Sequence, residues 1–130
     1  MTSEMLLDSL ERLRGTGSEF AGFLANHGPM GAEALVTLGA GDDAPAWTTR
    51  YRRARDLEPA PGPDRPLPDE AWRQATGDVR LLARWVATIR RDLAEAPWGE
   101  VLATWWPRLL PGLAASAAHG VIRTAHAVRS

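Results

Sequence analysis

Apolar side chains recur at helical spacing from the start of the chain. Leu6, Leu10 and Leu13 share one face of a helix predicted over residues 3–14. Gly15-Thr16-Gly17 ends that helix, because glycine readily takes the backbone conformation found just past a helix C-terminus. The first segment is therefore predicted to be an amphipathic helix that turns its leucines towards the core.

Two further helices are predicted after a turn at Asn26-His27-Gly28. The first begins at Pro29, whose missing N–H is not needed in the first helical turn, and stops at Gly39. The second carries Trp47 and Tyr51 one turn apart, so the two rings are expected to pack together.

The second half of the chain predicts three longer helical segments. After Asp78, an apolar stripe runs from Val79 to Leu93 with arginines on the other faces. A helix then opens at Pro97, and a last helix, rich in alanine and glycine, is predicted over residues 113–129.

The pattern contains no run of alternating β-branched residues long enough to predict a strand. Residues 56–68 hold five prolines, so this stretch is predicted to be an extended, partly polyproline surface connection. We therefore expect an all-α fold, an irregular multi-helix bundle that forms a single domain over residues 1–130 and carries the Pro-rich connection on its surface.

Composition supports one small globular domain and removes several kinds of chemistry. The 130 residues are 45 % hydrophobic, enough for a packed core. There is no cysteine, which excludes disulfides and thiol catalysis within this chain. All 15 basic residues are arginine, so no lysine is available as a Schiff-base nucleophile or a carboxylated metal ligand.

Charge and hydropathy bear on partners and location. The formal net charge of -1 gives no reason to expect a nucleic acid or an anionic membrane as partner. The N-terminus lacks the basic and apolar regions of a signal peptide, and no stretch approaches the roughly 18–20 apolar residues that span a bilayer. The expected location is the cytoplasm.

Two of the three histidines lie near the C-terminus. His119 and His126 are seven residues apart, so in a helix they differ by about 20° around the axis and by about 10.5 Å along it. Arg123 lies on the same side and could hold an anionic or carbonyl oxygen. Either these histidines line a metal or ligand pocket, or they are partly buried residues hydrogen-bonded to carboxylates.

The third histidine, His27, stands just before the helix that begins at Pro29. Imidazole is a common metal ligand, and Glu33, one turn into the helix, could orient the ring. The alternative is plain helix capping by the turn residues, with His27 as a polar surface residue.

Three motifs carry a resemblance to a known family. They are Asn26-His27-Gly28-Pro29-Met30-Gly31-Ala32-Glu33-Ala34-Leu35, Trp105-Trp106-Pro107-Arg108-Leu109-Leu110-Pro111-Gly112 and His119-Gly120-Val121-Ile122-Arg123-Thr124-Ala125-His126. In order and spacing they resemble the questin oxidase-like family, over nearly the whole chain. Members of that family are normally much longer, so the chain resembles their N-terminal portion.

The resemblance implies an all-helical oxygenase that acts with dioxygen on polyketide-derived aromatic substrates such as anthraquinones. NADPH is implied as a reductant for some members. Fe(II) or another divalent transition metal would be held by His27, His119 and His126. Arg123 and Asn26 would orient the ligand or substrate.

The chain departs from the family pattern because it has no lysine and no fourth histidine. The remaining ligands would come from a further C-terminal segment or from a partner chain, or they would be absent altogether. The alternative function is a non-catalytic helical interaction or structural module. In both cases we expect a homo-oligomer, or a partner chain that completes the fold.

Overall fold

The chain folds mainly into helices, and the computed structural model describes residues 3–130, without the side chains of residues 116 and 117. Within these residues the α-helices are α1 (Glu4–Arg12), α2 (Gly28–Thr37), α3 (Ala44–Ala54), α4 (Trp72–Ala75), α5 (Leu82–Glu95), α6 (Trp98–Leu109) and α7 (His119–Arg129). The strands are β1 (Thr16–Phe20), β2 (Leu24–Ala25) and β3 (Leu57–Pro59). Short 3-10 helices are η1 (Gly41–Asp43), η2 (Val79–Leu81), η3 (Leu110–Gly112) and η4 (Ala115–Ala118).

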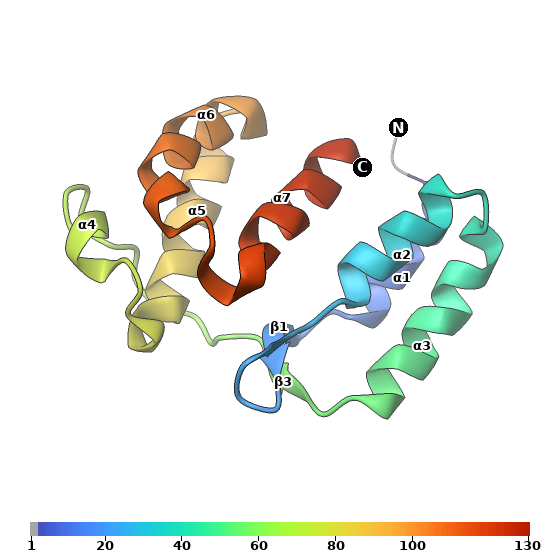
Figure 1. Ribbon diagram of the computed structural model, residues 1–130. Coiled ribbons are helices and arrows are strands. Elements are labelled where there is room, and N and C mark those ends of the chain that lie inside the picture. The colour runs from blue at the N-terminus through green and yellow to red at the C-terminus, as the bar shows by residue number, and fades with distance from the viewer. Residues whose placement is uncertain (1–2) are drawn as a thin grey trace. The chain divides into compact units, whose positions relative to one another are not determined.

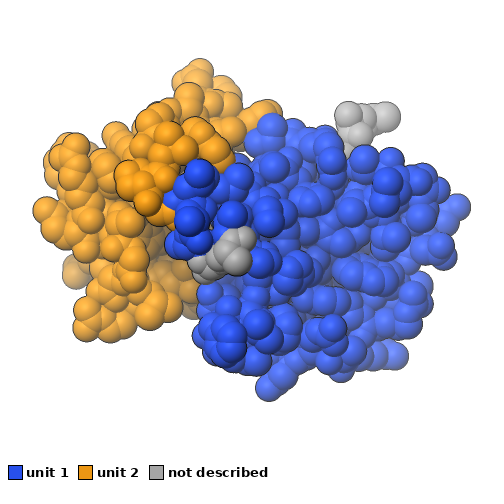
Figure 2. Space-filling model, viewed as in Figure 1, with its two compact units in different colours: residues 1–60, 113–130 blue, residues 61–112 orange. Residues whose placement is uncertain are grey.

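The chain divides into two compact units (Figure 2). Unit 1 comprises residues 1–60 and 113–130, so segments from both ends of the chain share it, and unit 2 comprises residues 61–112. The first boundary falls inside the Pro-rich connection predicted over residues 56–68. Each site described below lies within a single unit.

Unit 1 is built on α1, α2 and α3, which lie side by side, and α7 packs against α2 (Figure 1). Leu6 and Leu13 of the predicted leucine face are buried, whereas Leu10 remains 38 % exposed. Met30 of α2 completes the apolar core between the helices. The helices predicted from Leu6 and from Pro29 are thus confirmed.

A glycine allows α2 and α3 to approach closely. Trp47 stacks on Tyr51 as predicted, with ring centroids 5.2 Å apart. A Cβ atom at Gly31 would lie only 2.2 Å from the Trp47 ring, so only glycine fits there without movement of the indole.

The small sheet corrects the expectation of a purely all-α fold. Its order is β2-β1-β3 with antiparallel pairing, and Phe20 of β1 lies opposite both Leu24 and Leu57. The strands are short and do not alternate, and β3 pairs with β1 from about forty residues away, so the local pattern carries no strand signal. Gly17 permits the pairing, because a Cβ there would lie 2.8 Å from the Pro59 carbonyl oxygen.

The last helix also differs from its prediction. It begins at His119 instead of residue 113, and residues 115–118 form a 3-10 turn. Ala118 has φ +63°, a left-handed conformation that an L-amino acid adopts at a cost of about 1–2 kcal/mol. Local helix propensity is therefore overridden where the chain enters α7.

Unit 2 packs α5 against α6 around tryptophan. Trp105 is buried, and the Trp72 and Trp85 rings meet it edge-on. The Leu67 N–H donates to Thr88 Oγ1 at 2.8 Å, which anchors the Pro-rich segment to α5. Among the described residues, no helix is both long and apolar enough to cross a membrane.

Candidate functional site

Two helices that are far apart in the sequence bring the three histidines to the same region of unit 1. His119 is the first residue of α7, and its ring contacts His27, the residue directly before α2. Further along both helices, His126 of α7 contacts Glu33 of α2. The helices therefore run in the same direction, starting from the His27–His119 contact.

At the His27–His119 contact, the two Nε2 atoms are 3.0 Å apart and the ring planes are inclined by 84°. His27 is exposed, and His119 is half-buried. Two imidazole nitrogens at this separation either share one proton as donor and acceptor or bind one cation together. We call these two residues the His pair.

Main-chain contacts fix the position of His27. Its N–H donates to Tyr51 Oη at 2.8 Å, and its carbonyl oxygen accepts from the Gly31 N–H at 2.8 Å in the first turn of α2. His27 is the N-cap residue of α2, but its side chain makes no capping hydrogen bond. The ring is therefore available for contact with α7.

Asn26 is almost fully buried, at 1 % exposure, and its amide is occupied by the main chain. Its Nδ2 donates to the Gly17 carbonyl oxygen at 2.9 Å, and its Oδ1 accepts from the Gly28 N–H at 2.9 Å. Its own carbonyl oxygen accepts from Arg123 Nη1 at 2.8 Å. Asn26 thus shapes the turn that carries His27, and it presents its carbonyl group to α7.

Arg123 connects the two histidine-bearing segments. It lies one turn after His119 and bonds to the residue directly before His27. The half-buried guanidinium has no carboxylate partner among the described residues, and burial lowers the pKa of Arg123 below its ordinary value. A cation in this setting favours an external anion or carbonyl oxygen.

The second cluster surrounds the Glu33 carboxylate, whose side chain is 6 % exposed. Arg129 donates to both of its oxygens, at 2.8 and 2.5 Å, and Thr37 Oγ1 donates at 2.6 Å. His126 Nδ1 donates as well, since a carboxylate can only accept. The hydrogen bonds from Arg129 above all lower the pKa of Glu33 to about 2.

This cluster corrects one prediction: Glu33 is bonded to His126 and not to His27. Arg129 is a residue that the sequence analysis missed. A signal was present, because Arg129 follows His126 by three residues and so shares its side of a helix.

The structure therefore brings together two of the three predicted metal ligands. His27 and His119 meet, while His126 lies with Glu33. In the part of the chain that the structure describes, no three His, Asp or Glu side chains are grouped closely enough to share a metal ion. Participation of His126 in the same metal site stays a prediction.

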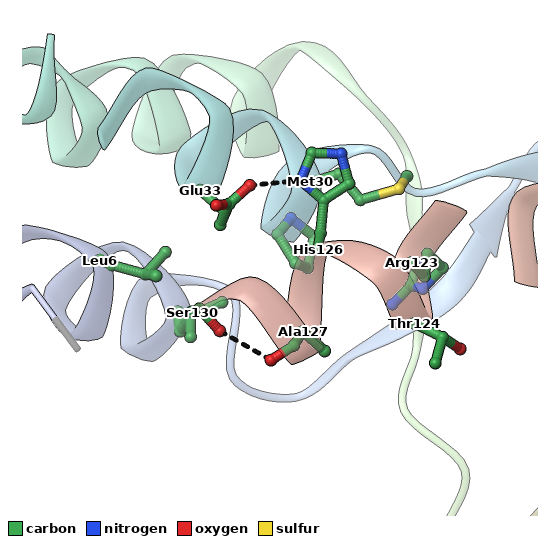
Figure 3. Close-up of a pocket in the computed structure, with 10 residues that line it drawn as sticks. Leu6, Met30, Glu33, Arg123, Thr124, His126, Ala127 and Ser130 are labelled. Atoms are coloured by element: carbon green, nitrogen blue, oxygen red, sulfur yellow. Dashed lines mark hydrogen bonds and ion pairs between the residues drawn. The ribbon is translucent and has the colours of Figure 1, made fainter. Parts of the chain in front are cut away.

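Helices α1, α2 and α7 also enclose a pocket of about 360 Å³ (Figure 3). Its lining is Leu6, Leu10, Pro29, Met30, Glu33, Arg123, Thr124, His126, Ala127 and Ser130. Figure 3 shows Glu33 and His126 pointing towards each other from α2 and α7. One pocket thus combines an apolar wall with two of the predicted site residues, Arg123 and His126.

Comparison with known proteins adds no relative. No protein-family model, curated protein or solved structure matches this chain.

Proposed function

We propose that this protein is an oxidoreductase of the oxygenase kind that binds a divalent transition metal, Fe(II) first of all, at His27 and His119. Its substrates are polyketide-derived aromatic molecules of the anthraquinone type and its reductant is NADPH, as the motif resemblance implies. The observation that carries the proposal is the 3.0 Å separation of the two Nε2 atoms.

The separation fits two ligands of one ion. Nitrogen ligands about 2.0–2.1 Å from a metal lie roughly 2.8–3.4 Å apart for bond angles between 90° and the tetrahedral value. Imidazole nitrogen suits Fe, Zn, Cu and Ni alike. Because the chain supplies two such ligands here, further coordination positions are left for water, substrate or a donor from another segment or chain.

The residues around the His pair have positioning roles. Asn26 and Tyr51 hold the main chain of His27, and Arg123 ties α7 to that same turn. The bound metal would supply Lewis acidity and a site for dioxygen. Arg123 can hold a substrate oxygen beside the pair and stabilise negative charge that develops on it.

The proposal is tested by metal content, which does not require a known substrate. Chelator-treated protein is loaded with Fe(II) under argon or with Zn(II), passed over a desalting column and analysed by plasma mass spectrometry. We expect one ion per chain in the wild type and loss of that ion in His27→Ala and His119→Ala. Retention of the ion in both variants would overturn the proposal. Loss in His126→Gln as well would support the three-histidine set.

A second function, that of a helical interaction module, is favoured by one observation in unit 2. Large apolar side chains on α6 and η3 lie open to solvent: Trp98, Trp106, Leu109 and Leu110 are 37–58 % exposed. Exposed apolar groups of this kind are typical of surfaces buried by a partner. Light scattering after size exclusion tests it: a wild-type oligomer that dissociates in Trp98→Ser/Trp106→Ser supports it, and a monomer argues against it.

A further inference from the structure

The pocket between α1, α2 and α7 is lined by one guanidinium, that of Arg123, for which no side-chain carboxylate partner exists among the described residues. Glu33 is the only carboxylate side chain among the lining residues, and Arg129 engages both of its oxygens. Arg123 also lines the pocket, and the hydrogen bond of its guanidinium within the described residues goes to a neutral carbonyl group, that of Asn26. Arg123 is therefore the lining residue that can pair with the carboxylate of a ligand.

The guanidinium also has donors to spare. Arginine carries five N–H donors, and within the part of the chain that the structure describes only Nη1 is engaged, with the Asn26 carbonyl oxygen at 2.8 Å. That bond holds the side chain in place, so a ligand would meet a cation whose orientation is already set. Preorganised guanidinium groups bind carboxylates with charge-assisted, often two-pronged hydrogen bonds.

The remaining walls select the body of the ligand. Leu6 and Met30 are at most 5 % exposed, and Leu10 and Pro29 extend the same apolar surface. His126 is fixed by Glu33 through Nδ1 and contributes a ring of constant orientation to the wall. A volume of about 360 Å³ is at the small end of ligand pockets, the size of a one- or two-ring molecule.

From these features we infer that the pocket binds a small apolar carboxylate, with the carboxylate on Arg123 and the hydrocarbon body against Leu6, Leu10 and Met30. The inference goes beyond the proposed oxygenase, because it requires no metal ion. The pocket lies entirely within unit 1, and Arg123 is its anchoring residue.

The test uses 2-naphthoate as the probe and 2-naphthalenemethanol as its neutral counterpart, titrated by calorimetry into the chelator-treated full chain. We expect the carboxylate to bind at least tenfold more tightly than the alcohol. Arg123→Gln keeps a donor for the Asn26 carbonyl group but removes the positive charge. The affinity for 2-naphthoate should therefore fall roughly ten- to a hundredfold. Arg123→Lys should restore part of the affinity.

Two further variants keep the test decisive if Arg123→Gln folds poorly. Ala127 is an exposed lining residue, so Ala127→Leu should fill the pocket without opening the core and should weaken both probes. Arg53→Gln removes an exposed arginine of α3 outside the pocket and should change neither affinity. The inference would be overturned by equal affinity of the wild type for the two probes, or by no binding to the wild type. It would also be overturned by unchanged binding in both Arg123→Gln and Ala127→Leu. Since metal-free protein is used, failure here leaves the metal proposal standing, and the reverse also holds.

Discussion

The two ends of the α2–α7 contact each hold a histidine from α7, but they are built differently. At the start of both helices, His119 meets another imidazole, His27, at an exposed position. At the far end, His126 meets a buried carboxylate, Glu33, which also accepts from Arg129 and Thr37.

The difference separates a structural contact from a potential ligand set. A buried carboxylate with several donors, a cation among them, is costly to break, because an unpaired charge would remain in the interior. Two imidazoles that face each other have no opposite charges to hold them together. They gain most when a cation occupies the position between their nitrogens. We therefore expect stability to depend on the Glu33 end and metal binding on the His pair.

The largest expected effect comes from breaking the Glu33 end. Glu33→Gln should lower the free energy of unfolding by about 3 kcal/mol, the lower bound for a broken buried ion pair, because the Arg129 side chain is half exposed and can be rehydrated. Urea denaturation measures the loss. The control is Glu11→Gln, which removes an exposed pair with Arg14 and should cost less than about 0.5 kcal/mol. A Glu33→Gln loss no larger than that of the control would contradict the comparison.

The next largest expected effect is the stabilisation of the fold by a metal ion bound at the His pair. At a free Zn(II) concentration of 100 times Kd, bound metal should stabilise the wild type by about 2.7 kcal/mol. His27→Ala should abolish this gain. Glu33→Gln should keep the same gain, although its free energy of unfolding without metal is lower than that of the wild type. Paired urea curves with and without metal measure both. A metal gain that survives in His27→Ala would place the ion elsewhere.

Acid should weaken the Glu33 end selectively. The folded pKa of Glu33, about 2, lies below its ordinary value of 4.5, so the ionised group stabilises the fold. That contribution is complete above pH 4.5 and falls as the pH drops towards 2, with about 2 kcal/mol lost by pH 3. The stability difference between wild type and Glu33→Gln should therefore shrink between pH 5 and pH 3. A constant difference over that range would show that the carboxylate does not titrate as inferred.

The smallest effect tests the His pair as a structural contact. In metal-free protein, His27→Ala should change the free energy of unfolding by less than about 0.5 kcal/mol, because the ring is exposed and its main-chain hydrogen bonds survive the substitution. A cost near that of Glu33→Gln would mean that the pair is a structural element of unit 1.

Much of the helical framework could be predicted because its signals are local. Pro29 near the start of α2, glycines just past α1 and α2, and the Trp47–Tyr51 spacing are each read from a few neighbouring residues. The sheet could not be predicted in this way, since β1 and β3 are short, do not alternate and pair across a long separation. The predicted start of α7 was wrong for a related reason. Ala118 adopts a left-handed conformation, which the helix propensity of alanine does not predict.

For the site, the sequence determined which residues could carry chemistry: three histidines, Arg123 and Glu33, with no cysteine or lysine to compete with them. Only the tertiary structure decided how they combine. Helix periodicity places His119 and His126 on one side of α7, but it cannot say which of them meets His27 and which meets Glu33, more than ninety residues away. The packing of α7 along α2 makes that choice, because two helices in contact match residues at corresponding positions along their lengths.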